Sequence, residues 1–246
     1  MPPNSALACY AVKLVLVWGT AWARTVRLAE LAMACVDVCC LGWESPTSEC
    51  AGVVRSRLLY GAPIWAEGLM TNRRSLLAVR RLHRTVAIRV VRGSRTISAA
   101  AAAVLNGFPP SELQALKCRE IYLHTRGLSG GVGPVGADVR VRARRALLDR
   151  WRDSLDTKAG APGISVLRAV LPNWDAWLDG GGPPLTHRVT QVLTGHGCFA
   201  EYLHRIGKEA TARCHHCDGS VHSAQHRLEY SPAWARPRRD LIVEVG

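Results

Sequence analysis

The stretch that decides the fold is residues 73–93, RRSLLAVRRLHRTVAIRVVRG. Its apolar residues recur at intervals of three and four, the spacing that places them on one face of a helix. Arg73, Arg80 and Arg84 lie off this stripe, and Gly93 ends the pattern. We therefore predict a basic amphipathic helix whose apolar side packs into a core. The apolar stripe consists of Leu76, Val79, Leu82, Val86 and Val90.

The segment around this helix lacks acidic residues. From Gly68 to Ser111 there is no Asp or Glu, whereas eight arginines fall inside it. Two interpretations stay open at this point, an ordinary solvated arginine face or a surface that contacts phosphate groups. A second basic helix is predicted from Asp138 to Leu155. The candidates for phosphate contact are Arg73, Arg74, Arg80, Arg81, Arg84 and Arg95 in the first segment, and Arg142 and Arg145 in the second.

The composition of the whole chain is also strongly basic. Its 246 residues contain 32 Lys+Arg and 19 Asp+Glu, a formal net charge of +13, and are 48% hydrophobic. The chain can therefore bury a core, and its charge favours a polyanionic partner. Of the cations 28 are Arg and 4 are Lys, and the planar guanidinium fork matches phosphate oxygens. A GC-rich gene would give the same bias, so composition alone leaves both explanations open.

The cysteines and the N-terminal segment bear on the compartment. Nine cysteines at irregular spacing do not form a disulfide framework, so we expect an intracellular protein, nuclear or cytoplasmic. Residues 14–23 resemble a signal peptide, but only Lys13 precedes them as a side-chain cation, and we do not expect secretion. No apolar run reaches the roughly 18 residues that span a bilayer, so we expect no membrane partner.

The remaining segments predict a mainly helical protein with little strand signal. The Ala run of residues 98–105 predicts a short helix, and Ser111-Glu112-Leu113-Gln114 resembles a capping box that opens a helix to about Arg126. Glycine-rich residues 127–136 predict a loop. Further helices are expected over residues 23–40, 49–59, 164–171 and 185–206, the last interrupted near residues 195–197.

Residues 214–231 hold the densest group of metal-ligating side chains. Cys214 and Cys217 form a CxxC, the usual first half of a tetrahedral zinc site, and His222 and His226 complete a C-x2-C-x4-H-x3-H pattern. The competing interpretation is a chance cluster of exposed histidines. A catalytic zinc would need a carboxylate base, for which Glu229 is the candidate, and an open coordination position.

Several side chains near this cluster have two interpretations each. Trp234 could stack on an unpaired base or belong to a local core, and we favour the core. Trp174 and Trp177 are likewise expected in the core. His196 and Cys198 could be additional metal ligands, although a structural turn residue is the simpler interpretation of His196.

Five blocks of this sequence, in the same order, resemble the polyprotein of arthropod non-LTR (LINE-type) retrotransposons, of the clade that inserts into ribosomal RNA genes. The resemblance covers about residues 48–246 and corresponds to the region after the reverse-transcriptase palm, from the end of the thumb to the C-terminal zinc knuckle. The blocks are Tyr60-Gly61-Ala62-Pro63-Ile64-Trp65-Ala66 before the arginine helix, Arg95-Thr96-Ile97-Ser98 with its alanine run, Leu193-Thr194-Gly195-His196-Gly197-Cys198-Phe199, Tyr202-Leu203-His204-Arg205, and the CxxC…His…Pro-Ala-Trp segment.

The resemblance implies a helical, bundle-like thumb and linker region followed by a small C-terminal zinc-knuckle segment. Residues 1–44 are apolar and unmatched, and residues 128–137 form a glycine-rich loop. The expected order is completed by thumb-like helices with the arginine helix (45–127), a helical linker region (138–206) and the zinc-knuckle-like segment (207–240).

The sequence departs from this family in two respects. It contains no Asp-Asp pair, whereas the family's palm holds its catalytic metals on one, so we expect no enzyme activity from this chain. The family's knuckle ends in a third cysteine, and Ser231 stands at that position here. His222 could supply the missing ligand, or the site could be broken.

We therefore expect a nucleic-acid-binding fragment of a reverse-transcriptase polyprotein that contacts RNA, DNA or both through arginine helices and a zinc knuckle during target-primed reverse transcription. An intact reverse transcriptase acting in trans is a further candidate partner, and no small-molecule substrate is expected. The alternative is a translated remnant of a decayed copy, without function.

Overall fold

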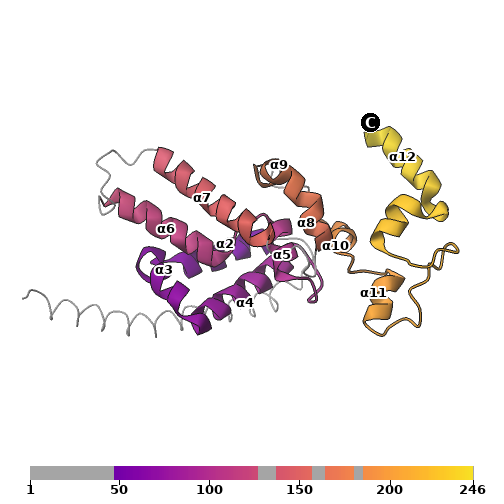
Figure 1. The fold of residues 1–246 in the computed structure, drawn as a ribbon, viewed down its shortest axis with the longest axis horizontal. Helices are drawn as coiled ribbons and strands as arrows, with labels where there is room; N and C mark the ends of the chain where they lie inside the picture. The colour runs from indigo at the N-terminus through magenta and orange to yellow at the C-terminus, as the bar shows by residue number, and fades with distance from the viewer. Residues whose placement is uncertain (1–46, 127–136, 157–163, 180–184, 246) are drawn as a thin grey trace, which may run out of the picture. The chain divides into compact units, whose positions relative to one another are not determined.

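The computed structural model describes residues 47–126, 137–156, 164–179 and 185–245. These residues form helices, turns and irregular segments without any strand, which confirms a mainly helical fold (Figure 1). They fall into two compact units. The first unit contains residues 47–90, 106–126 and 137–156, and the second contains residues 91–105, 164–179 and 185–245.

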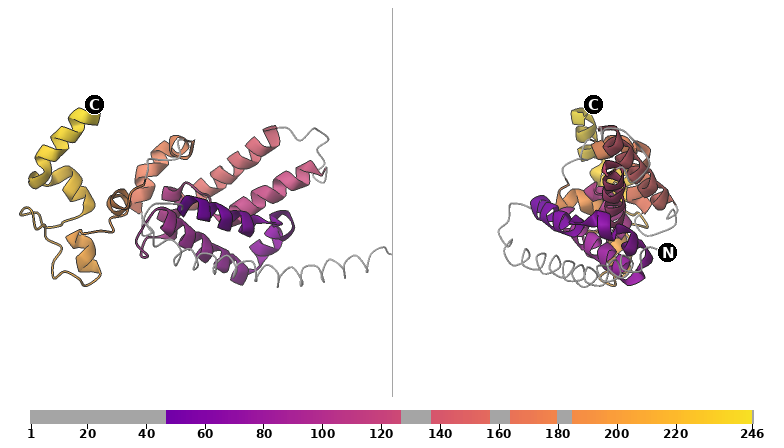
Figure 2. Two further views of the ribbon diagram at one scale, coloured as in Figure 1. Left: turned by 180° about the vertical axis from the view of Figure 1, so that it is seen from behind. Right: turned by 90° about the vertical axis from the view of Figure 1, so that its left-hand side faces the viewer.

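The first unit is a bundle of helices arranged around α6. Helix α6 (Ser111–Thr125) packs along both α3 (Ala62–Thr71) and α7 (Ala137–Asp156), and it also contacts α2 (Thr47–Leu59) and α4 (Arg73–Val90) (Figures 1 and 2). Small side chains allow α3 and α6 to approach closely, since Ala62, Ala66 and Ala115 are completely buried where they meet. A second group of buried residues joins α2, α3 and α4: Val54, Leu58, Leu69, Val79 and Leu82.

The predicted end of a helix at residue 59 is confirmed, and the next helix begins after only two residues. Gly61 adopts a left-handed conformation with φ of 67° between α2 and α3. Ala62 and Pro63 then form the first turn of α3, where the missing proline N–H leaves no helical bond unmade. Helix α3 itself is not anticipated by the sequence analysis.

The arginine helix is confirmed as α4, with Val79 and Leu82 buried on its apolar side. The capping box at the start of α6 is wrong. Ser111 already lies inside the helix after Pro110, and its hydroxyl hydrogen-bonds to Nδ1 of His83 at 3.1 Å instead of capping a backbone N–H. The side chain of Gln114 donates to the Pro109 carbonyl oxygen at 2.5 Å.

The second unit contains α5 (Ala99–Asn106, except its last residue) and the helices that follow residue 163. The hydroxyl of Thr190 donates to the Val91 carbonyl at 2.6 Å, and the Trp177 indole donates to the Val104 carbonyl at 3.0 Å, so residues 91–105 are tied to α9 and α10. Trp174 is buried, as expected. These later elements are α8 (Ile164–Val170), η1 (Leu171–Asn173), α9 (Trp174–Asp179), α10 (His187–Thr194), α11 (Ala200–Arg205), η2 (His226–Tyr230), η3 (Pro232–Trp234) and α12 (Ala235–Val245).

Some predictions lie outside the described residues. These are residues 1–44 with their expected helix, and the glycine-rich loop of residues 128–137, except Ala137, which begins α7. Residues 91–105, which lie inside the predicted segment 45–127, group with the helices after residue 163. Within the described part of the chain, no helix is both long enough and apolar enough to cross a lipid bilayer.

Candidate metal centre

A closed loop after α11 positions the CxxC motif. The chain leaves α11 through Gly207, whose φ of 72° requires glycine. Two backbone hydrogen bonds then pair the sides of the loop: Cys214 N–H donates to the Gly219 carbonyl at 3.0 Å, and His222 N–H donates to the Ala212 carbonyl at 2.7 Å. At the loop tip the His216 N–H donates to the Cys214 sulfur at 3.5 Å. Both cysteines therefore face inward from one tight turn.

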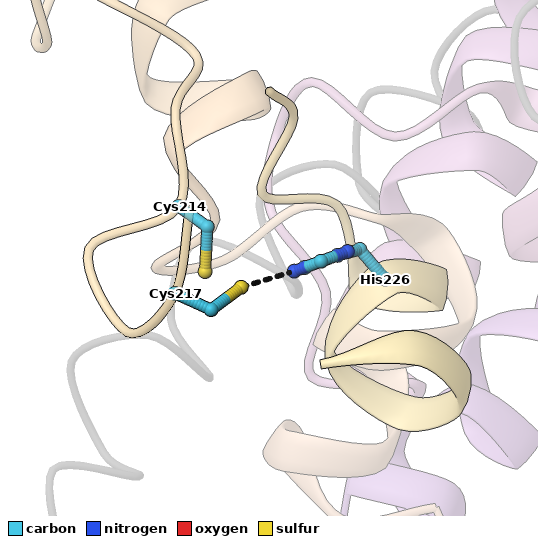
Figure 3. Close-up of side chains that lie close together, drawn as sticks. All are labelled: Cys214, Cys217 and His226. Carbon is cyan, nitrogen blue, oxygen red and sulfur yellow. Dashed lines mark hydrogen bonds between the residues drawn. The ribbon is translucent and has the colours of Figure 1, made fainter. Parts of the chain in front are cut away.

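Cys214, Cys217 and His226 form what we call the metal cluster (Figure 3). Their ligand atoms all lie within 4.8 Å of one another, and a hydrogen bond of 3.2 Å joins the Cys217 sulfur to His226 Nε2. Zinc bonds of about 2.3 Å to sulfur and about 2.0 Å to nitrogen separate the ligand atoms of a tetrahedral site by about 3.5 Å. The three side chains are therefore close to the spacing that such an ion requires, and they could hold one.

Gly219 makes room for the histidine. A Cβ atom at this position would lie 2.7 Å from Cε1 and 3.1 Å from Nε2 of His226. Any larger residue would push the imidazole away from the Cys217 sulfur. Gly219 is not among the predicted site residues, although a glycine two residues after a CxxC is a sequence signal for it.

A short π-helix delivers His226 to the cluster. The Ser223 hydroxyl accepts a hydrogen bond from the His226 N–H at 3.0 Å, and the Ser231 N–H donates to the His226 carbonyl at 2.8 Å. The wider turn of η2 places residue 231 back beside residue 226. Ser231 is 1% exposed, and its hydroxyl donates to the Cys217 sulfur at 3.9 Å.

His222 lies outside the metal cluster. Its ring is buried, its Nδ1 accepts a hydrogen bond from the Ala200 N–H at 3.3 Å, and its centroid lies 6.5 Å from that of His226. Burial, followed by the nearby charges of His216 and Arg227, lowers the pKa of His222 and favours its neutral ring. Its Nε2 is buried without a hydrogen-bond partner among the described residues. The structure therefore does not group His222 with the other three candidate ligands.

The other two ligand candidates lie elsewhere. His196 Nδ1 is 2.8 Å from the Thr194 carbonyl oxygen, and the ring packs on Tyr202 with centroids 4.9 Å apart, as a structural turn residue would. Cys198 is exposed and does not contribute to the metal cluster.

The local environment favours the thiolate form of Cys217. The backbone N–H of Gly219 is the largest cause that lowers the pKa of the Cys217 thiol to about 7, and hydrogen bonds with His226, Cys214 and Ser231 lower it further. Thiolate is the form that binds metal ions, so Cys217 can serve as a metal ligand near neutral pH.

The structure separates the arginines proposed to contact phosphate. Arg73, Arg74 and Arg81 on α4 and Arg145 on α7 are exposed and form no ion pair within the described part of the chain. Arg80 is bound to Glu112 with an N–O distance of 2.7 Å, and Arg142 to Asp138 at 3.3 Å. Arg84 is half-buried on α4, and Arg95 belongs to the second unit.

Two insect proteins are similar to this chain over most of its length. A retrovirus-related Pol polyprotein from type-1 retrotransposable element R1 4 of Nasonia vitripennis is 28% identical over 216 residues, which cover 84% of this chain and 53% of that protein. A 115 kDa protein in type-1 retrotransposable element R1DM of Drosophila melanogaster is 29% identical over 203 residues, covering 77% of this chain and 19% of that protein. The chain is homologous to R1-type non-LTR retrotransposon polyproteins of insects.

The similarity is consistent with the resemblance that the sequence blocks indicate. The chain spans about half the length of the first relative and about a fifth of the second. No protein-family model matches the chain, and no solved structure matches it either.

Proposed function

We propose that this chain is a nucleic-acid-binding region of a retrotransposon polyprotein, which contacts RNA or DNA phosphates through α4 and α7 and acts during target-primed reverse transcription. The observation that carries the proposal is the arginine surface of α4. Arg73, Arg74 and Arg81 are exposed there, and no acidic residue lies between Gly68 and Ser111. Unneutralised guanidinium groups on a rigid helix supply sequence-independent phosphate contacts.

Two separate basic surfaces follow from the fold of the first unit. Helix α6 contacts both α4 and α7, so it lies between the helices that carry Arg81 and Arg145 (Figure 1). Such an arrangement suits two strands, or two segments of one folded RNA, more than a single continuous groove. Arg80 and Arg142 already have carboxylate partners, so their charges are less available to phosphate groups.

The test is a salt series with labelled single-stranded RNA and DNA. The triple variant Arg73→Gln, Arg74→Gln, Arg81→Gln should reduce the slope of log affinity against log salt by about 2, because three phosphate contacts are lost. A control variant, Arg57→Gln, Arg168→Gln, Arg239→Gln, removes the same charge from exposed positions outside α4 and α7. Equal slopes for the two variants would refute a specific role for α4.

We further propose that the metal cluster holds zinc and completes a small knuckle at the C-terminus. The donor set of two thiolates and one imidazole suits zinc, and Gly219 leaves room for the ring. Two residues are candidates for the fourth zinc ligand. His222 is suggested by the sequence spacing, and the Ser231 hydroxyl lies beside Cys217. Zinc affinity of His222→Ala and Ser231→Ala, each measured against the unaltered chain, decides between them.

The proposal includes no catalysis by this chain, since its sequence has no Asp-Asp pair for polymerase metals. An intact reverse transcriptase is a candidate partner, and Tyr60 and Ile64, 79% and 63% exposed beside the α2–α3 break, offer it an apolar contact. Such a role belongs in the nucleus or the cytoplasm.

One observation, the serine at position 231, favours the alternative of a translated remnant without selected activity. That alternative predicts a chain that binds neither stoichiometric zinc nor RNA in a salt-dependent manner.

A further inference from the structure

A cavity of about 290 Å³ lies in the second unit between α10, Phe199, η2 and the beginning of α12. Its walls are largely apolar, with Val192, Phe199 and Trp234 contributing to them. Among the residues that line it there is no Asp or Glu, but there are three arginines, Arg188, Arg227 and Arg238. An apolar hollow surrounded by unbalanced positive charge suits a ligand with an apolar body and an anionic edge.

The aromatic and cationic groups of this cavity are already arranged as a platform. The Arg227 guanidinium lies over the Trp234 ring, 4.3 Å from its centroid. Arg238 donates to the Arg227 carbonyl at 3.3 Å and to the Ser231 carbonyl at 2.9 Å, which fixes one wall. Arg188, which is exposed on α10, also lines the cavity. A flat ligand entering here meets the aromatic side chains of Phe199 and Trp234 together with guanidinium groups.

The cavity and the metal cluster share a structural element. Arg227 and Leu228 line the cavity and lie in η2, directly after His226 of the cluster. Ser231, next to Cys217, is held by Arg238 of the cavity wall. A metal ion bound by His226 would therefore hold η2 in place and keep the cavity open.

We propose that this cavity binds one unpaired base of a single-stranded nucleic acid, with Arg188 and Arg227 contacting the phosphates on either side. The proposal rests on the proposed nucleic-acid function and gives it a specific contact. Every base has an apolar face that stacks on aromatic or guanidinium planes, and its backbone carries the required negative charge. The cavity is close to the lower limit of ligand sites, about 300 Å³, so it suits a single base, and a paired duplex keeps its bases out of reach.

Cys198 supplies a footprint of the occupied cavity. It is exposed, it lines the cavity, and its thiol can be alkylated, whereas Cys118 lies in the first unit and serves as the control. A short oligouridine and the matching oligothymidine should each slow alkylation of Cys198 severalfold without slowing that of Cys118, and a duplex of similar length should not. The oligonucleotide that protects Cys198 better shows whether the cavity prefers a base from RNA or from DNA.

A matched pair of variants tests the same point by affinity. Leu228→Glu places a carboxylate at the cavity from a side chain that is 50% exposed, whereas Ile206→Glu makes the same change at a 44% exposed position away from the cavity. We expect about tenfold weaker oligouridine binding for the first variant only, the effect of losing one stacked base. Arg188→Gln should weaken binding more than Arg239→Gln, which removes an equal charge outside the cavity.

The outcomes separate this proposal from the proposed function. If the chain binds oligouridine with a steep salt dependence but Cys198 stays reactive and the two glutamate variants bind equally, the cavity assignment is overturned and the arginine helices remain. If no strand binds at any salt concentration, both fail. If an acidic aromatic peptide protects Cys198 and the oligonucleotides do not, the cavity is a peptide site and the proposal is wrong.

Discussion

The strength of metal binding by this chain depends on Ser231. This residue is almost completely buried, and its hydroxyl faces the Cys217 sulfur at 3.9 Å, where a fourth ligand of the metal cluster would stand. A neutral hydroxyl is a poor zinc ligand compared with a thiolate. The metal cluster thus offers three strong ligands, and the hydroxyl beside it is a weak candidate for a fourth.

Ser231→Cys should restore the fourth ligand and tighten zinc binding by at least about tenfold, since structural zinc prefers four nitrogen and sulfur ligands. Competition with a chromophoric chelator at neutral pH measures the change. Ser220→Cys adds a thiol to an exposed position of the same loop and should leave zinc affinity unchanged. If both variants gain equally, the extra thiol acts by itself and Ser231 does not occupy a ligand position.

The candidate site shows what spacing can and cannot predict. Cys214, Cys217 and His226 were predicted from spacing alone, because a CxxC followed by histidines limits where the ligands can be. His222 satisfies the same spacing rule, yet its Nδ1 faces the Ala200 N–H. The backbone of His222 is hydrogen-bonded to Ala212 and Glu201, which holds this residue against the start of α11, and no local sequence signal marks these contacts.

At the scale of elements, the contact between α4 and α6 gives one arginine of the basic helix, Arg80, a structural role. The Glu112 side chain is 8% exposed, and one of its oxygens accepts a hydrogen bond from Arg80 at 2.7 Å. The first turn of α6 also favours a negative charge. The Arg80 side chain is 54% exposed, so solvent screens its end of the pair.

Arg80→Ala should lower the free energy of unfolding by about 1–2 kcal/mol, because it leaves a buried carboxylate without its cation. Arg81→Ala, at the exposed neighbouring position of α4, should cost less than about 0.5 kcal/mol. Urea denaturation of both variants measures the difference, and equal losses would show that the Arg80–Glu112 pair does not stabilise the bundle. RNA affinity should respond in the opposite order, more to Arg81 than to Arg80.

His83, one turn further along α4, gives the same contact a pH dependence. Burial lowers the pKa of His83 below its ordinary 6.5, although the charge of Glu112 raises it in part. The unfolded chain therefore takes up the proton first as the pH falls. The contribution of neutral His83 is complete above about pH 6.5 and is lost progressively below it.

His83→Gln should remove that part of the acid sensitivity, since glutamine stays neutral and can still hydrogen-bond with Ser111. Comparing urea midpoints at about pH 7.5 and about pH 5.5 tests this, with the ordinary pKa of histidine lying between the two. The unaltered chain should lose more stability between these conditions than the variant does. A variant that loses as much as the unaltered chain would contradict the assignment.

Helices with strong periodicity were predicted well from sequence, and those defined by their contacts were not. Helices α4, α7 and α10 follow apolar patterns or turn signals that are local, and Gly195 ends α10 with a φ of 68° as the glycine cluster suggested. Helix α3 was missed because Pro63 looks like a breaker unless its place in the first turn is known. The capping box failed because the Ser111 hydroxyl is used by His83, a partner 28 residues away in the sequence.

At the scale of the whole molecule, the chain crosses from the first unit to the second and back around residues 91–105. This segment is fixed by hydrogen bonds to distant residues of its own unit. Besides Thr190 and Trp177, His187 bonds to the Arg92 carbonyl at 2.7 Å, and Tyr202 bonds to Thr96 at 3.0 Å. The second unit therefore depends on residues that come from within the sequence of the first.

Thr190→Val tests whether residues 91–105 follow the second unit in stability. The variant keeps the shape of a side chain that is 1% exposed but leaves the buried Val91 carbonyl without its donor, at a cost of about 1–2 kcal/mol. Hydrogen exchange should accelerate in α5 and α10 and stay unchanged in α6, because local opening follows the unit to which each helix belongs. Thr194→Val, which removes a hydroxyl bonded only within α10, should leave α5 unaffected. Equal acceleration in α5 and α6 would mean that the two units open together, and zinc bound at the C-terminus would then stabilise the arginine helix as well.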